Sequence, residues 1–320
     1  MTKRKTSSKP VGILVLGMHR SGTSALTRML NLLGCALSED LIIPDRGNPE
    51  GYWESLRANQ INVALLAALG RGWDDIRELP ADWMTRPETD QAREQIRAFL
   101  DVDVSRKKPW VLKEPRLCRL APLWLEMMTE AGIDARVVIA LRHPAEVAYS
   151  LARRDGIAPG RSHLLWLQHV LEAERASRGR PRALVHYRDL LTNWRAQAAR
   201  IATTLGVRWP VTVNKAAAEI DAFLRPDLRH ADATEERDGA ARIEVPAPVL
   251  AVYRALLEGG GALFAAFGAR GQVGDPESMQ RNAELLEHLR EEAQQAFAKL
   301  DQAGPLLVEL IRQILSLIHI

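Results

Sequence analysis

The sequence lacks the features of several specialised protein classes. Among its 320 residues there are only two cysteines, Cys35 and Cys118, and neither belongs to a C-x-x-C pair. We therefore expect no disulfide framework and no zinc cluster, but two reduced thiols in a cytoplasmic protein. No apolar run approaches the ~18 residues of a membrane helix, so we expect no membrane span.

A strong charge of one sign is also missing. Lysine and arginine number 43 against 40 aspartates and glutamates, a net charge of +3. This balance is too weak to indicate nucleic acid as a partner, but it is compatible with an anionic ligand. The apolar content of 47% and the charged content of 26% are typical of a soluble globular protein.

Four segments differ in character along the chain. Residues 1–10 carry four basic residues and are expected to form a disordered leader. They resemble a short signal peptide, but the apolar run after them is only seven residues long and leads into polar residues. Residues 11–270 alternate strand and helix patterns, which predicts βαβ units and a mostly parallel sheet. Strands are expected at 11–16, 110–112, 136–141 and 183–186, and helices at 23–33, 54–70, 87–103, 119–131, 145–154, 162–178, 188–205 and 246–267, with 207–248 irregular.

The C-terminal part shows a different pattern. Apolar residues recur at alternating spacings of three and four over 275–314, which is a heptad seam. It predicts a coiled coil or a linker helix that mediates self-association or leads to a further domain, or else an amphipathic helix folded back on the body. Residues 315–320, LSLIHI, match one reading frame of a common sequencing adapter, so we expect an artefact there rather than a genuine apolar terminus.

The strongest local signal is the segment Gly17-Met18-His19-Arg20-Ser21-Gly22-Thr23-Ser24. A buried strand is expected before it and an amphipathic helix after it, which is the context of a phosphate-binding loop. Glycines allow a tight turn, and the N–H groups at the helix start attract an anion. Hydroxyls of Ser21, Thr23 and Ser24 and the guanidinium of Arg20 add donors.

This loop is not a Walker A motif, because Thr23 stands where that motif has lysine. The later strand RVVIAL ends in Arg142 rather than in an acidic Mg²⁺ ligand. Ser150 follows eight residues later on a helix, and both side chains are expected at the carboxyl edge of the sheet. The sequence therefore predicts a second anion site and no required metal.

These motifs together resemble those of a known family. GMHRSGTSALTRML is similar to the 5′-phosphosulfate loop of sulfotransferases that use 3′-phosphoadenosine 5′-phosphosulfate (PAPS), and LRHPAEVAYSLARRDG is similar to their 3′-phosphate motif. The resemblance covers about residues 11–267 and is strongest to bacterial and Golgi-type members, which have R-S-G-T. It implies a P-loop NTPase-like, three-layer α/β/α fold, with the helical tail outside it.

The resemblance also implies roles for individual residues. His19, Arg20, Ser21, Gly22, Thr23 and Ser24 would bind the 5′-phosphosulfate, and Arg142 and Ser150 the 3′-phosphate of PAPS. Cytosolic members use a histidine base two residues after a lysine, but Lys113 is followed by Glu114 and Pro115. A glutamate base is expected instead, with Glu54 first, Glu114 second and Glu50 third. Lys113 and Arg116 are expected to line the anionic site or to form structural salt bridges.

The acceptor is expected to be a hydroxylated molecule, and a saccharide or glycolipid follows from the resemblance alone. Trp53, Trp73, Trp83 and Trp110 are candidates for stacking on a ligand or for the core. His186 and Tyr187 are interpreted as structural. Two other functions stay open: a P-loop kinase of a small molecule that uses ATP and Mg²⁺, and a non-catalytic nucleotide-binding scaffold.

Overall fold

Four parallel strands form the centre of the molecule. They are β1 (Val11–Leu16), β2 (Trp110–Lys113), β3 (Asp134–Leu141) and β4 (Arg182–His186), in the sheet order β2-β1-β3-β4. The structure is a computed structural model, and it describes residues 9–105, 107–225 and 243–265, with residues 284, 287, 288 and 291.

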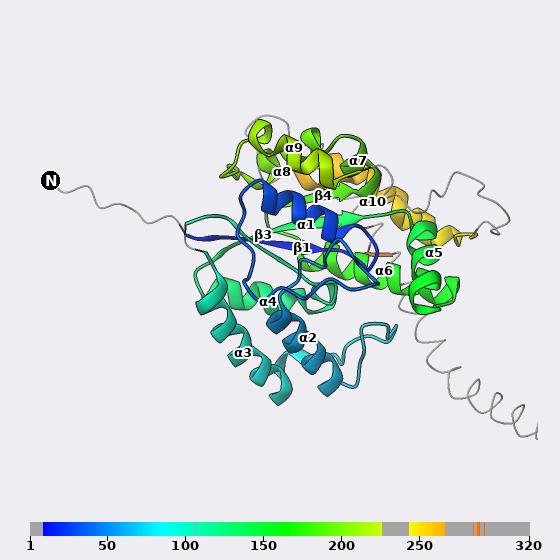
Figure 1. Cartoon of the computed structure of the whole chain (residues 1–320). Coiled ribbons are helices and arrows are strands. Elements are labelled where there is room, and N and C mark those ends of the chain that lie inside the picture. Colours follow the sequence, from blue (N-terminus) through cyan, green and yellow to red (C-terminus); the bar gives the residue numbers. More distant parts are fainter. Residues whose placement is uncertain are drawn as a thin grey trace, which may run out of the picture.

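Helices cover both faces of this sheet (Figure 1). One face packs against α1 (Thr23–Leu32), α7 (Tyr187–Thr192), α8 (Trp194–Leu205) and α9 (Val213–Phe223). The other packs against α2 (Leu56–Ala68), α3 (Pro87–Asp103), α4 (Leu117–Glu130), α5 (Pro144–Asp155) and α6 (Pro159–Ala176). The 3-10 helix η1 (Trp83–Thr85) precedes α3, and α10 (Ala247–Ala265) lies against β4, α5 and α6. The expected three-layer α/β/α fold with a parallel sheet is therefore confirmed.

Strand β1 shows why the sheet is buried on both sides. Its side chains alternate between the faces, since Ile13 and Val15 pack with α1 and α8 while Leu14 and Leu16 pack with α4 and α6. All four side chains are fully buried. A continuous apolar run is the pattern that such a two-sided strand requires.

The order of the strands fixes where a ligand can bind. Because β1 lies between β2 and β3 and all three are parallel, their carboxyl ends meet at one edge of the sheet. Val15 is paired with Lys113 on one side, and Leu16 with Ile139 on the other. The segments that follow β1, β2 and β3 are therefore neighbours in space, although they are far apart in the sequence.

Two helix predictions were wrong in detail. Residues 188–205 were expected to form one helix but form α7 and α8, because Asn193 leaves the helical conformation and its side chain accepts a hydrogen bond from the N–H of Ala196 (3.2 Å). The segment 207–248, expected to be irregular, contains α9. Thr212 caps that helix, and Ala216 and Ile220 bury its inner face.

Several predictions concern residues outside the described ones. Of the leader 1–10 only Lys9 and Pro10 are described, and of the predicted tail helix 275–314 only four positions. One of these, Glu287, pairs with Arg178, which follows α6, at 2.9 Å. The suspected artefact at 315–320 lies outside the described residues. Within the described ranges, no helix combines the length and the apolar character needed to cross a bilayer.

Candidate active site

One cavity of about 800 Å³ opens at the carboxyl edge of the sheet. The segments after β1, β2 and β3 contribute to its wall, as do the start of α1, the loop before α2 and the loop after it. Basic residues outnumber acidic ones on its wall, and they are Arg20, Arg46, Lys113, Arg116, Arg142, Arg153 and Arg154. The cavity therefore suits an anionic ligand.

The segment Gly17–Ser24 has the shape of an anion-binding loop. Gly22 is left-handed (φ 84°), and a Cβ there would lie 2.1 Å from the Tyr187 ring, so only glycine fits. Helix α1 begins directly afterwards at Thr23, so the N–H groups of its first turn have no partner one turn earlier in the helix. These groups and the helix dipole favour a negative charge at this point.

Arg20 lies in the middle of this loop and is also left-handed, with φ 68°. Its Nε donates to Ser150 Oγ (2.8 Å) on α5, and its Nη1 donates to the carbonyl of Gly47 (3.2 Å). Burial lowers the pKa of Arg20, and the neighbouring Arg154 and Arg142 lower it further. Arg20 and Ser150 thus face the same cavity.

Arg142 follows β3 and is buried beside the loop. Its Nε donates to Glu146 (2.7 Å) one turn into α5, and its Nη1 donates to the backbone carbonyl of Arg20 (3.1 Å). Its guanidinium lies 4.6 Å from the ring centre of Tyr187, which adds a cation–π contact. The two predicted anion sites are therefore side by side and not on opposite faces of the molecule.

A buried ion pair lies at the end of β2. Lys113 Nζ is 2.5 Å from Glu54 Oε1 and 3.2 Å from Ser24 Oγ. Lys113 is 1% exposed and Glu54 is 6% exposed, yet both line the cavity. Lys113 thus links the loop before α2 to the first turn of α1, so it holds the Glu54 carboxylate next to the anion-binding loop.

Glu114, the next residue, has a different environment. It is fully buried, accepts from Asn62 Nδ2 (2.7 Å) and from the N–H of Arg116 (3.1 Å), and pairs with the Arg116 guanidinium. Burial raises its pKa, and Glu54 nearby adds to the shift while Arg116 opposes it. Among the described residues that line the cavity, Arg116 is present and Glu114 is not.

Two other predicted loop residues have distinct environments. His19 lines the cavity, and its ring lies 4.5 Å from that of Trp73 and 6.3 Å from that of His169. Burial lowers the pKa of His19 well below 6.5, and nearby cations including Arg116 strengthen the effect, so its ring is neutral at pH 7. Ser21 is buried and is not among the lining residues, whereas Gly22, Thr23 and Ser24 are.

The structure adds lining residues that the sequence did not indicate. The loop 45–52 folds over the anion-binding loop, where Asn48 Nδ2 donates to Ser24 Oγ (3.3 Å) and Ser24 Oγ donates to the carbonyl of Tyr52 (3.2 Å). Tyr187, interpreted as structural, packs on Gly22 and also lines the cavity. The turn-rich sequence DRGNPEGY was a usable signal for the loop, but nothing in the sequence indicated its position.

The tryptophan candidates separate into two groups. Trp110 is fully buried in the core, and Trp83 packs against the core without lining the cavity. Trp53 lies on the loop before α2, where its ring contacts Arg28 of α1 and Phe223 of α9. Trp73 alone of the four lines the described cavity.

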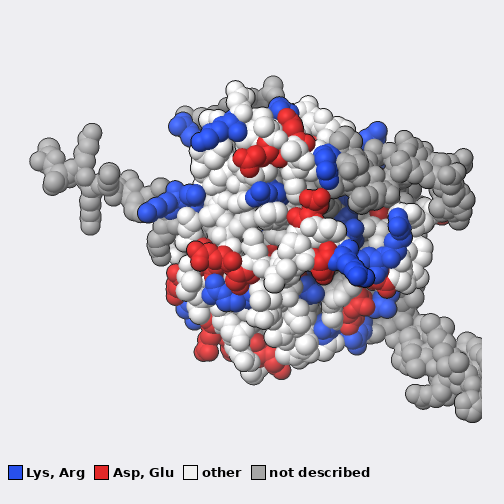
Figure 2. All heavy atoms as spheres, in the orientation of Figure 1, with Lys and Arg blue, Asp and Glu red and all other residues white. Residues whose placement is uncertain are grey.

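The surface around the site is mixed in charge. Figure 2 shows basic and acidic side chains interspersed on this face, with basic ones gathered beside α5.

A family model described as the sulfotransferase family matches residues 10–211, more than half of the chain. The chain belongs to the sulfotransferase family.

Solved structures give more distant likenesses to this sulfotransferase. A sulfotransferase from Mycobacterium tuberculosis is 16% identical, with 67% of this chain and 71% of that one covered and a TM-score of 0.37. The sulfotransferase domain of a Synechococcus olefin synthase is 17% identical, with 90% and 98% covered and a TM-score of 0.37. Retinol dehydratase in a complex with retinol and PAP is 15% identical, with 88% and 81% covered and a TM-score of 0.32. No curated protein matches the chain.

Proposed function

We propose that this sulfotransferase moves a sulfuryl group from PAPS to an acceptor hydroxyl, with Glu54 as the general base. The new S–O bond to the acceptor replaces the S–O bond to the 5′-phosphate, and adenosine 3′,5′-bisphosphate leaves. One observation carries the proposal: Arg20 of the loop and Arg142, which follows β3, line a single cavity, with Arg142 Nη1 3.1 Å from the Arg20 carbonyl. Two neighbouring cationic sites match a nucleotide that carries phosphate groups at both its 5′ and 3′ positions.

The donor groups of the cavity fit PAPS. Arg20, Thr23, Ser24 and the start of α1 offer N–H, hydroxyl and guanidinium donors for the 5′-phosphosulfate. Arg142 and Ser150 offer donors for the 3′-phosphate. When bound, PAPS supplies the activated sulfuryl group.

The Glu54–Lys113 pair is suited to the transfer itself. Glu54 takes the proton of the acceptor hydroxyl through a carboxylate oxygen, because a base has to lie at the cavity wall within reach of the acceptor. Lys113 holds that carboxylate in place at 2.5 Å. Arg20 and Lys113 offset the negative charge that develops during transfer, so positioning and electrostatics supply most of the rate enhancement.

The acceptor class is a separate part of the proposal. A hydroxylated acceptor, with a saccharide or glycolipid as the first choice, follows from the resemblance of the motifs to Golgi-type members. The cavity adds one supporting feature, because Trp73 offers an aromatic surface on which a ring can pack.

A nucleotide titration tests the proposal. Adenosine 3′,5′-bisphosphate (PAP) should bind more tightly than ATP, with or without Mg²⁺, because only PAP carries the 3′-phosphate. Arg142→Ala should weaken PAP binding by about tenfold or more and leave ATP binding little changed. Arg136→Ala is the matched control, since Arg136 lies in β3, the strand that precedes Arg142, but pairs with Asp134 and does not line the cavity. Equal affinities for PAP and ATP in the wild type would contradict the proposal.

A further inference from the structure

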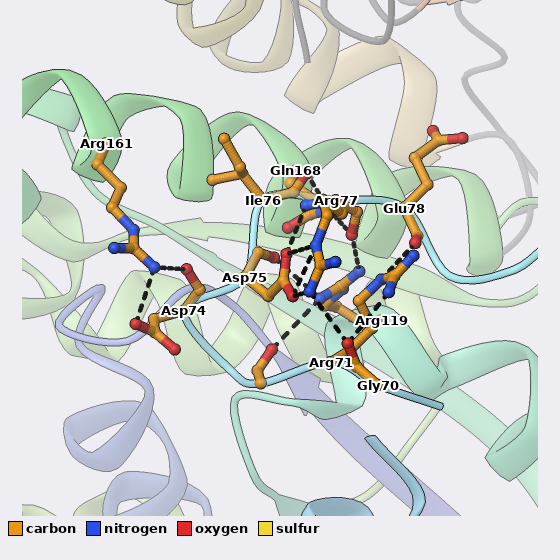
Figure 3. A network of polar contacts seen from close by, with 11 residues as sticks. Gly70, Arg71, Asp74, Asp75, Ile76, Arg77, Glu78, Arg119, Arg161 and Gln168 are labelled. Carbon is orange, nitrogen blue, oxygen red and sulfur yellow. Dashed lines mark hydrogen bonds and ion pairs between the residues drawn. The ribbon is translucent and has the colours of Figure 1, made fainter. Parts of the chain in front are cut away.

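The loop of residues 70–79, which follows α2, is held by side chains from two other helices (Figure 3). Arg119 of α4 donates from Nη1 to the carbonyl of Asp75 (3.0 Å) and from Nη2 to that of Arg77 (2.6 Å). Gln168 of α6 donates to the carbonyl of Ile76 (3.1 Å). The backbone of the 70–79 loop is therefore fixed at three successive residues.

The guanidinium of Arg119, which holds this loop, is buried. Its side chain is 0% exposed, and burial lowers its pKa. The nearest carboxylate, on Glu172, is 3.7 Å away, so backbone carbonyls supply its short contacts. Burying a charge without good hydrogen bonds is costly, so the 70–79 loop and Arg119 stabilise each other's position.

Within this fixed loop, different side chains have different surroundings. Ile76 and Leu79 pack against the core below α4 and α6. Trp73 lines the cavity, where its ring lies 4.5 Å from the neutral His19 ring and 5.9 Å from the Arg154 guanidinium. The loop thus presents an aromatic surface to the active site.

The start of α4 links this surface to the reacting groups. Lys113 ends β2, Arg116 lines the cavity and directly precedes α4, and Arg119 lies in the first turn of that helix. One short, well-packed segment therefore sets both the Glu54–Lys113 pair and the path of the 70–79 loop. Trp73 and the proposed base are thus both held through residues of this segment.

We infer that Trp73 is a specificity-determining residue, that it packs against a ring of the acceptor, and that Arg119 is the residue that positions it. This inference rests on the proposed function. The acceptor it implies is a hydroxylated ring, either a sugar whose C–H groups face the indole or a phenol, and not an acyclic alcohol. A neutral wall of Trp73 and His19 suits such a ring.

The test uses the full chain saturated with PAP and three probes: methyl β-glucopyranoside, 4-methylphenol and glycerol. Saturation-transfer NMR measures the affinity for each probe. At least one of the two ring probes should bind more tightly than glycerol, and Trp73→Ala should weaken that ring probe by about tenfold while leaving glycerol and PAP unchanged. Trp83→Ala is the matched control, because Trp83 packs on the same core but does not line the cavity.

The positioning role is tested with Arg119→Lys, which keeps the charge but loses the planar fork. It should weaken the ring probe selectively, and the double variant with Trp73→Ala should be no weaker than Trp73→Ala alone, because both changes act through Trp73. If Arg119→Lys does not fold, Gln168→Leu removes another clamp on the same loop and gives the same comparison.

Several results would overturn the inference. The first is that glycerol binds as tightly as both ring probes. The second is that Trp73→Ala leaves the affinity for the ring probe unchanged. The third is that the losses of affinity in Trp73→Ala and Arg119→Lys add up in the double variant. Failure of the wild type to bind PAP would contradict the proposed function instead. In that case the ring probes are titrated onto the free protein, and the comparison of wild type with Trp73→Ala still decides the inference.

Discussion

Glu54 and Glu114 lie in neighbouring regions of the molecule, but only the region of Glu54 has access to the cavity. Glu54 lies at the cavity wall, paired with Lys113, while Glu114 is enclosed by Asn62 and Arg116. Both are buried carboxylates with a basic partner, so residue type and burial do not distinguish them. The difference is access to the cavity, which makes one suited to proton transfer and the other to holding the fold.

The largest effect expected from this difference is on the reaction. Glu54→Gln should lower the transfer rate by about 10²–10⁴-fold, because an amide cannot accept the acceptor's proton. PAP affinity should change much less than the rate, because Glu54 is not among the residues proposed to bind the nucleotide. The rate of PAP release in the presence of PAPS and an acceptor measures the effect.

Glu50→Gln serves as the comparison, because Glu50 also lines the cavity but is exposed and pairs with Arg225 at 3.5 Å. If the transfer rate falls strongly in Glu50→Gln but not in Glu54→Gln, the general base is Glu50 of the 45–52 loop and not Glu54.

Glu114 should show the opposite behaviour, with the main effect on stability. Glu114→Ala leaves the Arg116 guanidinium and the Asn62 amide without their acceptor, and breaking a buried pair in this way costs about 3–5 kcal/mol. Urea unfolding measures the loss. Glu126→Ala is the control, since Glu126 of α4 pairs with Arg93 at the surface, and losing that pair should cost less than about 1 kcal/mol. Similar losses in the two variants would show that Glu114 is not a structural centre.

Asn62 sharpens the same contrast with a smaller effect. Its side chain donates to Glu114 (2.7 Å) and accepts from Trp124 Nε1 (2.8 Å), so Asn62→Ala removes one donor from Glu114 and leaves the buried Trp124 Nε1 without its acceptor, at a cost of about 1–3 kcal/mol. Thermal unfolding is a sufficient measurement. Asn59→Ala, on the same helix but at the cavity, should leave the midpoint nearly unchanged. If Asn59→Ala destabilises the protein more than Asn62→Ala does, Asn62 is not part of a stabilising cluster around Glu114.

The smallest effect is a difference in pH dependence. The pKa of Glu114 is raised above 4.5 by burial, so the folded state binds its proton more tightly than the unfolded state does. The stability of the wild type relative to Glu114→Gln should therefore fall as pH rises from about 4.5 through the folded pKa. Urea unfolding of both proteins at several pH values gives the difference, and parallel curves would contradict it.

Much of the fold followed from the sequence because its signals are local. The run Val11–Leu16 alternates between two buried faces, and Pro144 begins α5 with His143 as its cap, as a helix-start proline should. The prediction of one continuous helix over 188–205 is wrong, because the Asn193 side chain accepts a hydrogen bond from the Ala196 N–H and so caps a new helix there. Helix α9 was missed because its apolar face covers few residues.

The candidate site could be predicted only in part. Arg20, Ser150 and Arg142 were expected together from their motifs, and the structure brings them to one cavity. Whether Glu54 or Glu114 reaches the cavity depends on how α2 packs against α4, which no local pattern encodes. The position of Trp73 depends on Arg119, forty-six residues later in the chain, and carries no signal of its own.

The parallel sheet has a consequence for the order in which the protein is made. β1 must be flanked by β2 on one side and β3 on the other before Arg20 can meet Arg142 and Ser150. A ribosome that has released the first hundred residues has therefore exposed the whole anion-binding loop but neither Arg142 nor Ser150. Simultaneous contact of a nucleotide with all three side chains has to wait until the chain has emerged past α5.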